Sequence, residues 1–469
     1  MVVATERRVP MAAGKFIAQA LLALAACAGV IAQDGGQAQA GSASSPSNPS
    51  TPSSGTHRAI HHIQVPDEDA PTQPPELTQA EAAIEKQNYA AAESLLRKLV
   101  ERDATSYVGW FDLGFVENAL GNVDASITAY RKSVAAKPDV FESNLNLGLQ
   151  LAKTSQPGAE DFLRAATRLK PTTHVMEGQY RAWLALGNAL EKSKSEEALE
   201  AYQHAAAVQP KETEPYLAAG MLLEQQNKFG EAEEQYKQAL TIDSGSSEAV
   251  LGLANIYMRG RRFPEAEEYL RKLLKERPDQ PVVEIQLGRV LAAEGKNDEA
   301  IAALQAGIKV APGDEAAQRD LAEVYTTAGK NDLAAAAYGV LVEAHPNDAE
   351  LHRRLGQAFL RQKKLKEAQQ EFLAAIKLKP DLGEAYGDLA FAAGENENYE
   401  LAIKALNARS KLLPDNAVTY FLRASASDHL KDFKAAAVNY HLFLNTAGGK
   451  YPDYEWKAKH RLIAIEPRK

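Results

Sequence analysis

Five arginines in the second half of the chain are the clearest candidates for binding chemistry: Arg259, Arg289, Arg319, Arg353 and Arg361. A guanidinium group donates hydrogen bonds in a planar fork that matches carboxylate and phosphate groups. The whole chain has a formal net charge of -9, so these cations stand against an acidic background. The same negative charge argues against a general nucleic-acid binder, which needs a basic surface to neutralise phosphates.

Motifs for catalysis or metal binding do not occur in the sequence. It contains no P-loop, no H-E-x-x-H and no G-x-S-x-G. A single cysteine excludes an internal disulfide framework and a Cys-rich zinc site. His57, His61 and His62 have metal-like spacing, but they lie in a Ser/Pro-rich stretch without a rigid scaffold. We therefore expect no enzymatic activity, no cofactor and no bound metal.

The first 32 residues have the layout of an export signal. An apolar run from Phe16 to Ala32 follows three basic residues. Leu24-Ala25-Ala26-Cys27 resembles the lipobox of bacterial lipoproteins, in which the cysteine is acylated. Alternatively, cleavage after Ala32 releases a chain that begins at Gln33. A third reading, an uncleaved anchor, is disfavoured because this run of seventeen residues falls short of the roughly 20 that span a bilayer.

Both cleavage readings predict an exported protein, periplasmic or tethered to the outer membrane if Cys27 is lipidated, and secreted otherwise. The lipoprotein resemblance favours the outer membrane because residue 28 is Ala and not Asp. Residues 33–75 are rich in Ser, Pro, Gly, Gln and Thr, a composition that buries too little to fold. We expect a disordered tether there.

The rest of the chain repeats itself every 34 residues. Prolines stand at 278, 312, 346, 380 and 414, and alanines at 232, 266, 300, 334, 368, 402 and 436. Within each period, apolar or small residues recur at positions 4, 7, 8 and 11, which is one face of a helix. A second helix carries Ala at position 20 and an aromatic residue or Leu at 24. Proline at position 32 should end it.

The pattern W-x2-L-G-x2-Y, then A-x3-F, then P resembles the tetratricopeptide repeat (TPR) family. Trp110, Leu113 and Gly114 carry its first part, and Ala368 with Phe372 its second. The resemblance implies an all-α, right-handed superhelical solenoid of about eleven helical hairpins over residues 76–448. Residues 449–469 should form a capping helix that contains Tyr454, Trp456, Leu462 and Ile463 and covers the last repeat. In the units 141–173 and 180–212 the two helices are one residue out of phase, which predicts a tightened turn; in the first of these units Pro157-Gly158 would cause it. Residues 173–179 are predicted to form a short extension between these units.

In TPR proteins the first helix of each unit lines a concave groove that accepts segments of partner proteins. By that resemblance the groove should be apolar near the N-terminus, basic in the middle and aromatic near the C-terminus. The candidate partner-binding residues are Phe111, Phe115, Asn255, Arg259, Arg289, Arg319, Arg353, Gln357, Arg361, Phe391 and Phe421.

Two functions fit these residues, and one structural role competes with them. The first function is a non-enzymatic protein–protein interaction scaffold of the bacterial cell envelope, with membrane contact only through the N-terminal signal or lipid anchor. The alternative is a component of polysaccharide export or secretion machinery that binds an acidic glycan through the arginines. The competing role is structural: the arginines are solvated or paired with nearby Glu284, Asp320, Glu323 and Glu350.

Overall fold

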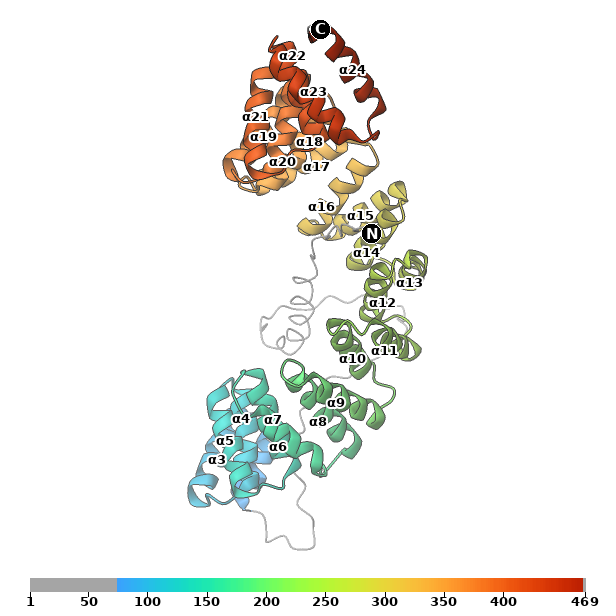
Figure 1. The fold of residues 1–469 in the computed structure, drawn as a ribbon. Helices are drawn as coiled ribbons and strands as arrows, with labels where there is room; N and C mark the ends of the chain where they lie inside the picture. Colours follow the sequence, from blue (N-terminus) through green and yellow to red (C-terminus); the bar gives the residue numbers. More distant parts are fainter. Residues whose placement is uncertain (1–73, 467–469) are drawn as a thin grey trace, which may run out of the picture. The chain divides into compact units, whose positions relative to one another are not determined.

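The computed structural model describes residues 74–466, which contain 23 α-helices, α2 to α24, and no strand. The expected signal sequence with Cys27, and the expected tether up to residue 73, lie outside the described residues. Helices α2 to α23 alternate as the first and second helix of consecutive hairpins, and α24 follows them (Figure 1). The chain is therefore an all-α stack of two-helix units, as the sequence predicted.

The first helices are α2 (Pro75–Glu85), α4 (Tyr107–Ala119), α6 (Phe141–Lys153), α8 (Val175–Leu190), α10 (Glu214–Gln225), α12 (Ser247–Arg259), α14 (Pro281–Ala293), α16 (Glu315–Thr327), α18 (Ala349–Arg361), α20 (Gly383–Glu395) and α22 (Ala417–His429). The second helices are α3 (Tyr89–Arg102), α5 (Val123–Ala136), α7 (Ala159–Arg168), α9 (Ser195–Val208), α11 (Phe229–Ile242), α13 (Phe263–Glu276), α15 (Asn297–Val310), α17 (Asn331–Ala344), α19 (Leu365–Leu378), α21 (Tyr399–Leu412) and α23 (Phe433–Ala447). The last helix, α24, spans Pro452–Ile465.

Small residues at position 8 allow the two helices of a hairpin to touch. A Cβ atom added to Gly187 would lie 2.4 Å from the ring of Tyr202, which occupies position 24 of the shifted second helix. One added to Gly356 would lie 2.7 Å from the ring of Phe372. Both distances are far below ordinary van der Waals contact, so a larger residue would push the aromatic ring out of the core.

The second helices end where the proline comb predicted. Helices α13, α15, α17, α19 and α21 each stop two residues before the proline at position 32. Proline disfavours the helical conformation in the residue before it, and it lacks the N–H that the helix would need. In these five units the proline therefore marks where the second helix ends.

Ten of the eleven hairpins have a left-handed residue in their turn, and the exception is the turn between α8 and α9, where Lys194 has a φ of -144°. Gly121, Gly295 and Gly329 have φ values of 83°, 81° and 71° at position 15. Seven other units place a non-glycine residue there, also with positive φ: Gln87, Ser155, Asn227, Arg261, Lys363, Glu397 and Lys431. The backbone conformation is therefore set by the hairpin geometry, even where the side chain opposes it.

Two units depart from the regular pattern. Helix α7 has only ten residues and begins after Gly158, whose φ of 93° makes the tightened turn that the sequence predicted. Helix α8 has sixteen residues and begins at Val175. The residues read as a short extension are therefore mostly the first turn of α8.

The last helix covers the final hairpin with only part of its apolar surface. Leu462 is 6% exposed and packs with α22 and α23, and the ring of Tyr454 lies 4.8 Å from that of Phe421. Trp456 and Ile463, in contrast, are 60% and 68% exposed. Trp456 and Ile463 therefore lie on the side of α24 that faces away from the final hairpin.

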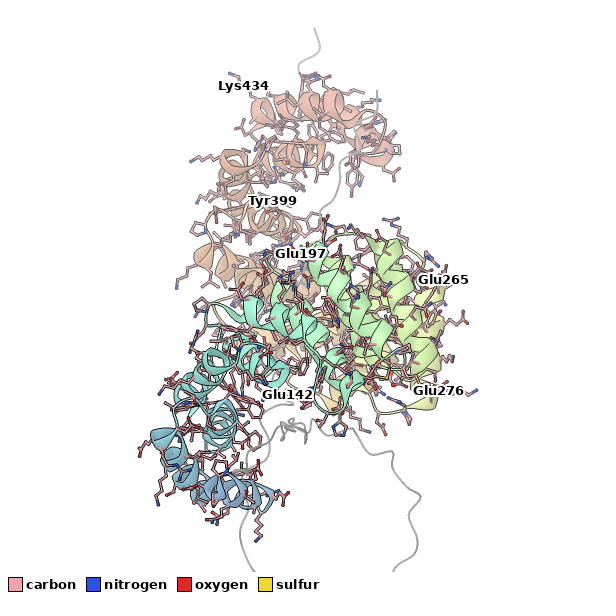
Figure 2. The ribbon with its side chains drawn as sticks, turned by 90° about the horizontal axis from the view of Figure 1, so that it is seen from below. Glu142, Glu197, Glu265, Glu276, Tyr399 and Lys434 are labelled. Carbon is pink, nitrogen blue, oxygen red and sulfur yellow. The ribbon has the colours of Figure 1, made fainter. Side chains whose placement is uncertain are left out.

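The two sides of the stack differ in how neighbouring units meet. First helices contact the first helices of adjacent units, as α10 does with α12 and α18 with α20. Second helices show no comparable contact with each other in the described part of the chain. Charged second-helix residues such as Glu265 and Lys434 point away from the stack (Figure 2). We call the side formed by successive first helices the first-helix face.

Candidate binding face

The arginines of the first-helix face pair with acidic residues of the next unit. Arg289 Nε of α14 lies 2.6 Å from Asp320 Oδ2 of α16. Both terminal nitrogens of Arg319 lie 3.3 Å from Asp348 Oδ2, and Asp348 also caps the N-terminus of α18. These contacts join units that are adjacent in the stack.

Arg353 makes the most extensive of these contacts. Its Nη1 donates to Asp388 Oδ2 of α20 at 3.0 Å, while Nε and Nη2 donate to Glu350 on its own helix at 2.9 and 2.8 Å. Gln357 Nε2 donates to the same Asp388 oxygen at 2.8 Å. The Arg353 side chain is only 15% exposed, so it is held between two helices.

The N-terminal end of this series is weaker. Arg259 Nε is 4.0 Å from Glu224 of the preceding unit, and the Arg259 guanidinium lies 5.6 Å from the ring centroid of Phe229. Asn255 accepts a hydrogen bond from Gln286 Nε2 at 3.1 Å. We call the inter-unit contacts from Glu224 to Asp388 the polar ladder.

In the polar ladder, burial and the arginine charges shift the pKa values of the carboxylates in opposite directions. Burial raises the pKa of Asp388 above its ordinary value, and the hydrogen bond from Gln357 and the charge of Arg353 oppose that shift. Burial likewise raises the pKa of Asp320, and Arg289 opposes it. Desolvated carboxylates of this kind need their cation nearby. The arginines therefore hold adjacent first helices together, and only part of each guanidinium remains accessible to a partner.

The aromatic candidates divide into buried and exposed residues. Phe111 is fully buried, with its ring 5.7 Å from that of Tyr130, and Phe115 is 7% exposed beside Tyr89. Both belong to the core of the N-terminal units. Phe391 of α20 is 41% exposed on the first-helix face.

Phe421 belongs to an aromatic cluster at the C-terminal end of the stack. Its ring lies 5.1 Å from that of Phe443 and 4.8 Å from that of Tyr454. The side chain is half-buried. Phe421 therefore joins α22 to α23 and α24, and Phe391 is the aromatic candidate that stays open to solvent.

Arg361 differs from the other arginines of the series because it forms no ion pair with any described residue and is exposed. Its position relative to Phe391 follows from the ladder. Gln357 contacts Asp388, and one helical turn further along α18 and α20 lie Arg361 and Phe391. An unpaired cation and an exposed aromatic ring are therefore neighbours on the first-helix face.

A buried acidic group lies near the other end of the stack. Asp112 of α4 is 2% exposed, and its Oδ2 has no hydrogen-bond partner. Burial raises the pKa of Asp112 well above its ordinary value, and the charge of Glu81 raises it further. Sequence reasoning missed this residue because its position in the repeat does not reveal its burial.

Sequence reasoning also missed half of the ladder. It named Asp320 and Glu350 as possible partners but not Asp348 or Asp388. The missing signal was the offset between partners, which is 31 residues for Arg289 and Asp320 and 35 for Arg353 and Asp388. Residues near position 6 of one unit meet positions 5 and 9 of the unit before it.

Neither a metal cluster nor a membrane span emerges from the described residues. No group of three or more His, Cys, Asp and Glu side chains there could hold a metal ion. No helix between residues 74 and 466 combines the length and hydrophobicity that crossing a membrane requires.

Two-helix units stacked in constant register define an α-solenoid, a class of helical repeat proteins. Family models described as tetratricopeptide repeat match residues 77–141, 223–285, 291–358 and 349–382. The chain is therefore a tetratricopeptide repeat protein, as its sequence pattern indicated. No curated protein matches the sequence.

Several solved structures are similar to this chain at low identity. MamA 41-end from Desulfovibrio magneticus RS-1 is 20% identical, with a TM-score of 0.34, and the match covers 36% of this chain and 95% of that chain. YrrB, titled a TPR protein with an unusual peptide-binding site, is 21% identical, with a TM-score of 0.30 and coverage of 47% and 96%. Cut9–Hcn1, an APC/C hetero-tetramer, is 16% identical, with a TM-score of 0.38 and coverage of 82% and 83%.

Proposed function

We propose that this protein is a non-enzymatic scaffold of the bacterial cell envelope that holds a segment of a partner protein on its first-helix face. The TPR fold suggests a protein–protein interaction scaffold because stacked hairpins present one continuous surface that can follow an extended segment. The envelope location is supported by the export-type sequence of residues 1–32.

The exposed pair of Arg361 and Phe391 carries the proposal. Aromatic residues and arginine dominate the binding energy of protein interfaces, and here they stand together without an ion-pair or ring partner among residues 74–466. A matching segment would place an apolar side chain on Phe391 and a carboxylate on Arg361. Truncating such a contact typically costs about 2 kcal/mol or more, which is roughly thirtyfold in affinity.

The polar ladder disfavours the alternative of an acidic glycan. A repeating polyanion needs a row of free cations, but Arg289, Arg319 and Arg353 already donate to carboxylates of the chain. Replacing these arginines by acidic residues would break the ion pairs between units, so a loss of binding could result from lower stability. A decisive binding experiment therefore has to avoid the ladder.

In-cell photo-crosslinking provides that experiment. A photo-reactive amino acid at Phe391 should capture one defined partner, whereas the same amino acid at Val340, which is 58% exposed on the second helix α17, should not. Arg361→Glu should abolish the capture at position 391, and Arg354→Glu, on the same helix, should leave it intact. Equal capture at positions 391 and 340, or capture that ignores Arg361→Glu, would contradict the proposal.

A further inference from the structure

Helix α24 has two apolar faces. Ala458 and Leu462 lie four residues apart and are 0% and 6% exposed, so they form the face that packs on the stack. Trp456 and Ile463 lie seven residues apart on the other side and are 60% and 68% exposed. With 3.6 residues per turn, Trp456, His460 and Ile463 form one stripe. The Trp456 and His460 rings contact each other, with centroids 3.9 Å apart.

This exposed stripe is unexpected on a helix that packs on the last hairpin of a solenoid. Terminal helices of repeat proteins normally present a polar outer face, because nothing further covers them. A tryptophan and an isoleucine together on that face lower solubility unless something binds there. The outer stripe of α24 therefore needs an occupant.

The charge around the stripe indicates which occupant fits. The described residues 450–466 contain four Lys or Arg and three Asp or Glu, a formal charge of +1, whereas the whole chain carries -9. Lys457 and Lys459 are exposed on the two flanks of the stripe, while Arg461 is turned toward the stack and paired with Asp428 at 2.9 Å. Two exposed cations thus border the apolar stripe, and Lys457 Nζ lies 5.4 Å from the ring centroid of Tyr454.

A second copy of the chain fits this surface poorly. An antiparallel pairing of two α24 helices would have its two-fold axis at the midpoint of the stripe, beside Lys459 and His460. The two Lys459 side chains would then face each other, and like charges at such a distance are destabilising. The rim of the stripe favours an anionic occupant instead.

We propose that the outer face of α24 binds an anionic membrane surface, with Trp456 and Ile463 inserted among the headgroups and Lys457 and Lys459 reaching anionic lipids. Tryptophan is enriched at the membrane–water interface, and lysine side chains extend from an apolar stripe toward lipid phosphates. Helix α24 has 14 residues, so it lies in the interface plane and does not span the bilayer. This contact is separate from the N-terminal leader and does not depend on partner binding at Phe391.

The test uses the full chain with Trp456 as its only tryptophan, obtained by Trp110→Phe and Trp183→Phe. Vesicles of phosphatidylcholine with phosphatidylglycerol, carrying brominated acyl chains, should shift the emission of Trp456 to the blue and quench it. Since two lysines near an anionic surface contribute about 1 kcal/mol each, Lys457→Gln with Lys459→Gln should raise the lipid concentration for half-quenching by about thirtyfold. Binding through the leader alone does not move this signal.

A matched reporter sits on a different exposed surface. Trp456→Phe with Val438→Trp places the single tryptophan on α23, where Val438 is 55% exposed, and its emission should not change with vesicles. An unchanged Trp456 emission, or an equal response from both reporters, overturns the proposal. Quenching by phosphatidylcholine vesicles alone, without added benefit from phosphatidylglycerol, overturns the role of the lysines. A blue shift that depends on protein concentration without lipid assigns the stripe to a second copy.

Discussion

Replacing Arg353 by alanine tests whether the polar ladder holds adjacent units together. The Arg353 and Asp388 side chains are 15% and 26% exposed, so their ion pair is neither fully buried nor at the surface. An exposed pair contributes up to about 1 kcal/mol, and removing one partner of a fully buried pair costs about 3–5 kcal/mol. We expect Arg353→Ala to lower the free energy of unfolding by about 2 kcal/mol, between these limits.

Arg354 offers a matched control on the same helix. It also donates to Glu350, but its side chain is 41% exposed and it reaches no residue of the next unit. Arg354→Ala should cost about 0.5 kcal/mol or less. A double-mutant cycle of Arg353→Ala with Asp388→Ala should give a coupling energy of about 1–2 kcal/mol.

Urea unfolding followed by circular dichroism gives the overall change in stability. Hydrogen exchange locates it, because units of a solenoid contact only their neighbours and open locally. Protection should fall in α18 and α20 and stay unchanged in α4 and α6. Equal effects of Arg353→Ala and Arg354→Ala, or a loss of protection spread evenly along the chain, would refute the ladder as an inter-unit contact.

Four further substitutions probe three other features. Gly187→Ala should destabilise the protein by about 1–3 kcal/mol, because the new Cβ would lie 2.4 Å from the ring of Tyr202. Gly339→Ala has open space around it and should stabilise the protein by up to about 1 kcal/mol. Similar urea midpoints for the two variants would contradict the packing argument. Lys363→Gly should raise the urea midpoint by the equivalent of about 0.5–1 kcal/mol, since glycine adopts positive φ freely, and a lower midpoint would count against it. The pKa of Asp112 is raised in the folded chain, so its contribution to stability is present below about pH 4 and is lost as the pH rises. In urea titrations, Asp112→Asn should therefore stabilise the protein more at pH 7 than at pH 4. A larger gain at pH 4 would exclude this explanation.

The hairpins could be predicted from the sequence because their causes are local. Proline, glycine and the apolar stripe each act within one 34-residue unit, and repetition fixes the register. The left-handed turn residues show the limit of this reasoning, since Lys363 or Glu397 gives no sign of positive φ by itself. Their conformation is evident only when they are aligned with Gly121 of another unit.

The binding face was less predictable because its contacts cross from one unit to the next. Residue types predicted a row of arginines, but whether each is free depends on which carboxylate the neighbouring helix brings beside it. Helix α24 illustrates the same limit. Its apolar residues point to a buried helix, but periodicity cannot decide which of two apolar faces is covered, and the structure leaves Trp456 outside.

The ladder also means that the units of this protein are not interchangeable. Asp320 and Arg354 occupy the same place in successive units, and so do Asp388 and Leu422. Loss of one whole unit, residues 315–348, would keep the helical register but bring Arg289 opposite Arg354, a like-charge contact. Loss of residues 383–416 would set Leu422 against Arg353. The fold alone would allow the array to lengthen or shorten by 34 residues, but the charges specify which neighbour follows which.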